Sequence, residues 1–485
     1  MYYLLRIIEK ILIIYFSLYL IIDIAMYLYS IYVFFKAGSN NHNKYDFYKY
    51  PISIIVPAYN EQVSIITCIE MLSNLDYPDY EIILVNDGST DNTLQHIHNN
   101  FTLINRTNTQ KQLLKTMKIK SVFDIKDKNI VVIDKENGGK ADAINTGINF
   151  AKGDYICTID ADSILDNQAL KSVVIPFIKS QNTIVTGGQL AVANDIKLEN
   201  NKVVNAKTPK NIWVQWQIIE YIKSFMIARI ALSKINALLI MSGAFSLFKK
   251  DDLLQIGGFL SPVNNHSFIE KNIGTGKQTV CEDMEIVVRL WKYKRDKKIN
   301  AKALFLAQPV CWTEVPDNPQ NLFKQRSRWH QGLGETINIH KNMIFEPRYG
   351  VTGLIGLPYY LFFEFLSPLI KIFSLIFIFV AAKYGVINTM WVIMLLASVM
   401  LTSAIIMSTI TAVIEYWSNK NYPANRDALR YKTFGDWLWL IITGIVAEFS
   451  YSFFKIAAQL NGIINFIKKK HDWKKFERKG VEREV

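Results

Sequence analysis

Four long apolar stretches constrain the fold of this 485-residue chain more than any other feature. They cover residues 7–35, 351–382, 386–414 and 434–467, and each is longer than the roughly 20 residues that a membrane-spanning helix needs. The residues between the first two stretches read as a soluble block. With 50% hydrophobic residues and a net charge of +13, the chain fits neither a disordered protein nor an ordinary soluble enzyme. The sequence therefore predicts a folded domain attached to a membrane.

The first stretch is interpreted as a retained anchor, residues 1–36, rather than a signal peptide. It is too long for the apolar region of a signal peptide, and no small-residue cleavage site follows it. Tyrosines lie near both of its ends, as in the aromatic belts of membrane helices.

Basic residues predict how the chain is oriented. They follow the first, third and fourth apolar stretches: Lys36, Lys44 and Lys49; Lys420, Arg426, Arg430 and Lys432; Lys468, Lys469, Lys470, Lys474 and Lys475. Because such flanks face the cytoplasm, residues 434–467 must cross the membrane an even number of times. This predicts two short helices hinged near residues 448–450 and five spans in all, with one tilted helix and a surface-lying tail as the alternative. We expect a multi-pass protein of the bacterial cytoplasmic membrane with a cytosolic catalytic domain (51–349), C-terminal transmembrane helices (350–467) and a basic cytosolic tail (468–485).

The soluble block alternates strands with helices. Short β-branched runs at 52–57, 81–86, 129–134 and 154–159 are each followed by a helix-like segment, which predicts a parallel sheet covered on both faces. In such sheets ligands bind beyond the carboxyl ends of the strands. The residues found there include carboxylates, glycines and one lysine: Pro57, Tyr59, Glu61, Asp87, Lys140, Asp160 and Asp162.

Asp160 and Asp162 are candidate metal ligands. Two hard oxygen ligands so close together suit Mg²⁺ or Mn²⁺ bound to a substrate phosphate, although solvated loop acids are the alternative. Lys140 follows two glycines and precedes a helix, so it could reach the same phosphates. Ala141 stands where a Walker loop requires Ser or Thr, which disfavours ATP hydrolysis.

A second acidic pair begins a helix-like segment at residues 279–294, "TVCEDMEIVVRLWKYK". Asp283 could act there as a general base, or Glu282 and Asp283 could simply be favourable charges at a helix N-terminus. The chain's cysteines, Cys68, Cys157, Cys281 and Cys311, follow no metal or redox spacing and are expected to be buried side chains.

The motifs "VPAYNE", "NDGSTD", "DAD", "ED" and "QRSRW", in this order between apolar helices, resemble the processive membrane-bound family 2 glycosyltransferases. These are relatives of cellulose, hyaluronan and poly-β-1,6-N-acetylglucosamine synthases. The resemblance implies a GT-A fold, an α/β Rossmann-like domain with a mostly parallel sheet, plus transmembrane helices.

The resemblance also implies roles for individual residues. The nucleoside of the donor would be bound by Pro57, Tyr59, Glu61 and Asp87. Its diphosphate side would be bound by Lys140, Asp160, Gln325 and Arg328. The metal would be held by Asp160 and Asp162. Asp283, next to Glu282, would be the base, and the acceptor would meet Ser242, Gly243 and Trp329. Cys281 replaces the family's threonine, which leaves chemistry intact but puts its contribution to acceptor fit in doubt. For Lys324 and Arg326, contact with anionic lipid is the alternative.

The function implied is inverting transfer from a UDP-sugar, with UDP-N-acetylglucosamine as the first guess, to a growing β-linked polysaccharide that is then translocated. Such exopolysaccharides form biofilms, and an accessory membrane subunit is a possible partner; no nucleic-acid partner is expected. The alternatives are transfer of a single sugar to a lipid acceptor and a non-catalytic transporter or scaffold. Residues 101–128 are expected to form a loop with a weak helix, and residues 257–278 a gate over the cleft or a surface loop.

Overall fold

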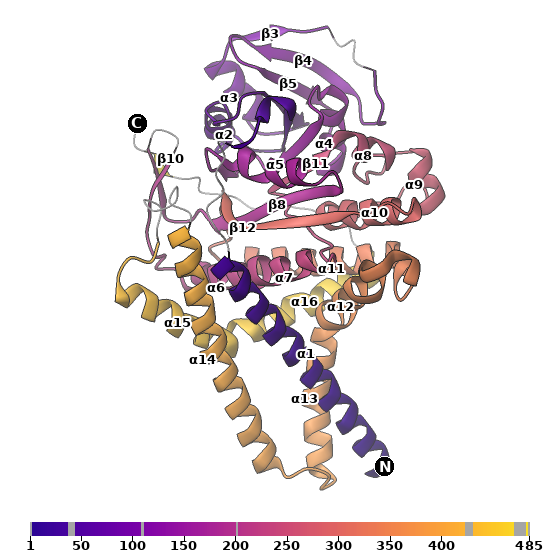
Figure 1. Ribbon diagram of the computed structural model, residues 1–485, viewed down its shortest axis with the longest axis vertical. Helices are drawn as coiled ribbons and strands as arrows, with labels where there is room; N and C mark the ends of the chain where they lie inside the picture. The colour runs from indigo at the N-terminus through magenta and orange to yellow at the C-terminus, as the bar shows by residue number, and fades with distance from the viewer. Residues whose placement is uncertain are drawn as a thin grey trace.

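The computed structural model describes residues 2–36, 44–107, 111–199, 202–421, 430–469 and 482–483. A sheet domain stands on a layer of helices, from which longer helices extend away from the sheet (Figure 1). The strands are β1 (Ile52–Ala58), β2 (Tyr80–Asp87), β3 (Leu103–Asn105), β4 (Ile119–Ile125), β5 (Ile130–Lys135), β6 (Tyr155–Ile159), β7 (Ile164–Leu165), β8 (Thr183–Val192), β9 (Ile196–Glu199), β10 (Lys202–Ala206), β11 (Phe245–Lys249), β12 (Lys302–Thr313) and β13 (Glu482–Arg483). The helices are α1 (Tyr2–Lys36), α2 (Ile65–Leu72), α3 (Thr93–Asn100), α4 (Lys140–Phe150), α5 (Ala169–Lys179), α6 (Ile212–Glu220), α7 (Ala228–Lys234), α8 (Lys250–Gln255), α9 (Ser267–Asn272), α10 (Glu282–Asp296), α11 (Pro319–Ile339), α12 (Leu357–Tyr359), α13 (Ser367–Lys383), α14 (Thr389–Asn421), α15 (Phe434–Phe449) and α16 (Tyr451–Ile467).

The main sheet has the order β3-β4-β5-β2-β1-β6-β11-β8-β12-β7. Its centre is the parallel run β5-β2-β1-β6, which confirms the four predicted strands and their direction. These strands are buried on both faces, as their continuous β-branched runs require. β3 and β4 at one edge and β11 beyond β6 pair antiparallel, so the sheet is mixed outside its parallel centre.

The prediction of a loop with a weak helix over residues 101–128 is wrong. Its described residues contain β3 and β4, which pair with each other, and β4 pairs with β5. β4 is the second strand from one edge of the sheet, and only Val122 and Ile125 in it are buried, so its sequence "IKSVFDI" (119–125) lacks the regular alternation that marks a strand.

A layer of helices lies beneath the sheet domain (Figure 1). α6, a π-helical segment (Tyr221–Ile227) and α7 form one continuous helical stretch from residue 212 to 234. α11 carries the "QRSRW" motif, and α16 packs along it. The motif therefore lies between the catalytic domain and the apolar helices.

Two helices, Tyr2–Val33 and Met390–Trp417, are long and apolar enough to cross a membrane, and two bent pairs bring the number to four if each pair is one span. The expected five spans therefore exceed what helix length and composition support in the described chain. The pair α15 and α16 is bent by 48° at Ser450, which is where the hinge was predicted.

Candidate active site

The turns that follow β1 and β2 are bonded to each other. Asn60 adopts a left-handed backbone conformation, with φ 56°, which Asn tolerates better than most residues. Its Oδ1 accepts the Thr90 N–H at 2.8 Å, and its own N–H donates to Ser89 Oγ at 2.9 Å. The neighbouring strand ends are thus fixed as one surface, which carries the predicted nucleoside residues Pro57, Tyr59 and Glu61.

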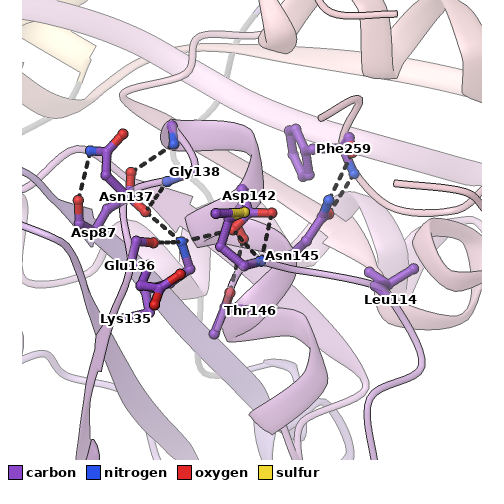
Figure 2. A network of polar contacts seen from close by, with 12 residues as sticks. Asp87, Leu114, Lys135, Glu136, Asn137, Gly138, Asp142, Asn145, Thr146 and Phe259 are labelled. Atoms are coloured by element: carbon purple, nitrogen blue, oxygen red, sulfur yellow. Dashed lines mark hydrogen bonds and ion pairs between the residues drawn. The ribbon is translucent and has the colours of Figure 1, made fainter. Parts of the chain in front are cut away.

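Asp87, the last residue of β2, is buried and holds the turn that precedes α4 (Figure 2). Its Oδ1 accepts from Lys135 Nζ at 2.5 Å and from the Gly138 N–H at 3.0 Å, and its Oδ2 accepts from the Gly139 N–H at 2.8 Å. Lys135 also pairs with Asp142 at 2.7 Å. The carboxylate of Asp87 therefore positions the start of α4, while its predicted contact with a nucleoside stays a prediction.

Polar side chains on the buried face of α4 fix two further segments (Figure 2). Asp142 accepts from the Met117 N–H at 3.2 Å. The Asn145 amide bonds both the N–H and the C=O of Phe259, at 2.7 and 2.8 Å. Residues 257–260 are buried, so this part of the predicted gate is a fixed part of the domain rather than a surface loop.

Lys140, the first residue of α4, meets two acidic segments. Its Nζ lies 2.7 Å from Asp160 Oδ1 and 3.1 Å from Glu282 Oε1. Burial alone would lower the pKa of Lys140, but the carboxylates of Asp160 and Glu282 raise it above its usual range. The lysine is therefore charged, and it joins the end of β6 to the start of α10.

Asp283 is held by a donor on each carboxylate oxygen. Oδ2 accepts the Gly243 N–H at 3.0 Å, and Oδ1 lies 3.0 Å from the Cys281 thiol. Burial raises the pKa of Cys281, so the thiol stays protonated and donates. Burial, followed by the charge of Glu282, also raises the pKa of Asp283, which is the direction expected for a general base.

Gly243 allows this close approach. A Cβ at this position would lie 2.8 Å from Lys140 Nζ and 3.5 Å from Asp283 Oδ2. The turn containing Ser242 and Gly243 therefore packs directly against Lys140 and Asp283. The structure brings these predicted residues together from four separate parts of the chain.

Asp160 and Asp162 fit a divalent cation that shares its coordination with a substrate. Among the described residues, no group of three or more His, Cys, Asp or Glu side chains could by itself hold a metal ion. Two carboxylates in one turn are nevertheless the donor set that Mg²⁺ uses when phosphates and waters supply the remaining ligands. The Lys140 ammonium already pairs with Asp160, so a metal ion at this carboxylate would share or replace that pair.

In α11, Arg326 is buried and paired, which contradicts its assignment to lipid contact. Its guanidinium donates to Glu220 Oε2 at 2.6 and 3.0 Å, and also to Gln325 Oε1. The guanidinium carbon lies 4.1 Å from the centre of the Trp329 ring. Lys324 is exposed, so lipid contact remains open for that residue.

α11, which carries Arg328, packs against the segment that carries Asp283. The Nε of Arg328 is buried and has no hydrogen-bond partner among the described residues. One turn later, a Cβ at Gly332 would lie 2.3 Å from Cys281 Cβ, so α11 and the start of α10 touch. The two motifs that the sequence singled out separately therefore lie on segments that touch.

Sequence reasoning missed three charged residues of this region. Lys135 is the last residue of β5, and a lysine at the end of a strand is the sequence signal by which it could have been found. Glu220 and Arg229 lie in helices that sequence reasoning did not single out, and no motif marks them. The partners of Glu220, which are Arg326 and Lys455, come from distant segments, so local sequence could not identify this residue.

Comparison with known proteins agrees with this geometry. The sequence profile of Glycosyl transferase family 2 matches residues 53–256, and that of Glycosyl transferase family group 2 matches residues 155–418, which is more than half of the chain. Poly-beta-1,6-N-acetyl-D-glucosamine synthases from Staphylococcus epidermidis and Staphylococcus aureus are 27% and 28% identical over 286 residues, 59% of this chain and 55% of theirs. The chain thus matches about half the length of these curated relatives.

A solved mannosyltransferase from Pyrobaculum calidifontis, in complex with GDP-Man and Mn2+, is also similar. It is 14% identical with a TM-score of 0.51, covering 96% of this chain and 99% of that one. At this identity the likeness concerns the fold, and it confirms the expected GT-A-like α/β domain with apolar helices.

Proposed function

This chain belongs to the family 2 glycosyltransferases, and from that premise we propose that it is a membrane-embedded inverting enzyme that extends a β-linked polysaccharide from a UDP-sugar. The single observation that carries the proposal is that Lys140 forms ion pairs with both Asp160 and Glu282. These pairs lie beside Asp283, which accepts a hydrogen bond from the Gly243 N–H. UDP-N-acetylglucosamine is the first donor to test, because the matched relatives are named for a polymer of that sugar.

In this mechanism Asp283 accepts the proton of the acceptor hydroxyl. Each of its oxygens already accepts one hydrogen bond, and a carboxylate oxygen can accept a second, so a lone pair remains for the acceptor. The raised pKa strengthens the base, and one in-line displacement inverts the donor's anomeric carbon. No covalent intermediate on the protein is required.

The leaving diphosphate would be held by Lys140 and Arg328. The unpartnered Nε of Arg328 supports this role, since arginine gives charge-assisted hydrogen bonds to phosphate. Asp160 and Asp162 would hold Mg²⁺ or Mn²⁺, which when bound neutralises developing negative charge on the diphosphate. Gln325 would lie on the same donor side, next to Arg326.

Trp329 would bind the acceptor sugar on one ring face. Arg326 covers the other face at 4.1 Å, which holds the indole in a fixed orientation. An indole face suits the apolar face of a pyranose. The acceptor would then lie between Trp329 and the turn of Ser242 and Gly243.

For the membrane part we propose three crossings, α1, α13 and α14, with α15 and α16 lying at the cytosolic surface. α13 and α16 both have 17 residues, fewer than the roughly 20 that a crossing needs, so length does not separate them. α1, α13 and α14 extend away from the sheet domain, whereas α16 lies in the layer of helices beneath it (Figure 1). α16 packs along α11, and a Cβ at Gly462 would lie 2.5 Å from the Ser327 C=O oxygen. With three crossings every basic flank lies on the cytosolic side, so the charge rule holds without extra spans.

Purified protein in lipid nanodiscs, incubated with UDP-N-acetylglucosamine or UDP-glucose and Mn²⁺, tests the function by product size. A ladder or high polymer supports the proposal. A single sugar on lipid would instead favour the lipid-acceptor alternative, and absence of transfer from any donor would refute catalysis. Polymer inside sealed proteoliposomes would test translocation, and copurification from native membranes would test an accessory subunit.

A further inference from the structure

Arg229 in α7 is a buried cation that forms no ion pair with the residues that the structure describes. Its side chain is only 6% exposed, and its Nη1 has no hydrogen-bond partner in the described part of the chain. Its guanidinium carbon lies 4.5 Å from the centre of the Phe225 ring and 5.8 Å from that of Phe305. The phenyl rings cover the guanidinium but cannot accept its in-plane hydrogen bonds. Because a buried unpaired charge is costly, its retention points to a ligand that supplies oxygen atoms.

The position of Arg229 relates it to the acceptor side of the site. The Phe225 ring that covers it also contacts the Trp329 ring, with centroids 5.6 Å apart. The charge of Arg229 lowers the pKa of Asp283 against the larger effect of burial, so the guanidinium and the base act on one another. A π-helical segment, Tyr221–Ile227, immediately precedes Arg229, and such segments often occur at functional sites.

Building on the proposed function, we propose that Arg229 binds the acceptor saccharide, donating hydrogen bonds to hydroxyl or amide oxygens of the sugar held between Trp329 and Asp283. Guanidinium N–H groups are directional donors that can bond two sugar oxygens at once. The aromatic neighbours suit the apolar face of a pyranose. The nearby Asp283 carboxylate disfavours an anion at this place, so a neutral saccharide fits better than the diphosphate.

The test uses the full-length protein in nanodiscs with UDP-N-acetylglucosamine and Mn²⁺. Arg229→Met keeps the length of the side chain and removes its donors, and Arg229→Lys restores one charge without the planar fork. Arg106→Met is the matched control, because Arg106 lies at the start of the edge hairpin in a partly exposed pair with Asp124. Sugar transfer and its pH profile, product length, inhibition by UDP and the unfolding temperature are measured for each protein.

We expect Arg229→Met to lower transfer by about 10-fold or more, the loss typical of a charged hydrogen-bond donor. Its products should be shorter, because the acceptor leaves sooner. Inhibition by UDP should stay within about twofold of wild type, and Arg229→Lys should be intermediate. Because the lost charge was unpaired, the unfolding temperature of Arg229→Met should not fall.

Any of four results would overturn the proposal. Weakened inhibition by UDP would assign Arg229 to the diphosphate. A changed pH profile with unchanged product length would make it a counter-ion of Asp283. Unchanged transfer by Arg229→Met would exclude a role in acceptor binding. A fall in unfolding temperature that accounts for the lost transfer would show that Arg229 is a structural residue. If wild type makes no polymer from any donor, the proposed function fails instead. Arg229 is then tested by comparing UDP binding and the transfer of a single sugar in wild type and Arg229→Met.

Discussion

The ion pair between Glu220 and Arg326 should hold the motif helix in its active position. Glu220 is 8% exposed and also accepts from the Tyr451 hydroxyl at 2.8 Å, while Lys455 lies 3.5 Å away. Burial alone would raise the pKa of Glu220, but Arg326 and Lys455 lower it to about 2, so it is ionised in any workable buffer. Glu220→Gln keeps the size of the side chain and removes its charge, which leaves Arg326 buried and unpaired.

Breaking a buried pair from one side costs about 3–5 kcal/mol. An unfolding entropy of about 2.1 cal/mol/K per residue, taken over the chain's 485 residues, gives roughly 1 kcal/mol/K. The unfolding temperature should therefore fall by roughly 3–5 °C. A thiol-reactive dye can follow unfolding, because Cys68, Cys157, Cys281 and Cys311 are all buried.

The double variant Glu220→Gln with Arg326→Met separates stability from positioning. Replacing both charged partners is often neutral, so most of the lost stability should return. Transfer should stay low, because Trp329 has lost the guanidinium that covers one ring face. Asp124→Asn, which breaks the partly exposed pair with Arg106, should change stability by less than about 1 kcal/mol. Equal stability of Glu220→Gln and wild type, or full activity of the double variant, would refute this reasoning.

Further outcomes follow from the base and its surroundings. Asp283→Asn should lower transfer by roughly 10²–10⁴-fold while UDP still binds, and full activity would exclude Asp283 as the base. Because the base must be ionised, activity should fall as the pH drops through the raised pKa of Asp283. The Cys281 thiol donates a hydrogen bond that lowers this pKa, so Cys281→Ala should move the fall in activity to higher pH. Cys281→Ser keeps a donor and should stay near wild type. A chelator should abolish transfer and Mn²⁺ or Mg²⁺ should restore it, and Asp162→Asn should raise the metal concentration needed; activity that survives chelation would contradict this. Gly332→Ala places a Cβ 2.3 Å from that of Cys281, so transfer should fall, and an unchanged rate would contradict the contact.

The parallel centre of the sheet was predictable, because strands buried on both faces leave continuous β-branched runs in the sequence. The predicted gathering of Lys140, Asp160 and Asp283 followed from their places at strand and helix ends. Patterns of this kind are local, and sequence can show them.

The partners of charged residues could not be predicted in the same way. Arg326 reads as a surface residue, because its neighbours are polar and basic, and only Glu220 from another helix explains its burial. The strands β3 and β4 were missed because few of their residues are buried, so their sequences resemble a loop. Contacts between distant segments decide such cases.

The helix α11 is pinned by glycine contacts on two sides, at Gly332 against the start of α10 and at Gly462 against the backbone of Ser327. Because there is so little space at either contact, we expect a displacement of α16 to move α11, and α11 to move the segment that carries Asp283. A bilayer that is too thin or too strongly curved for the apolar helices should therefore slow the chemistry itself. Lipid composition would then act as a rate-setting condition for this enzyme.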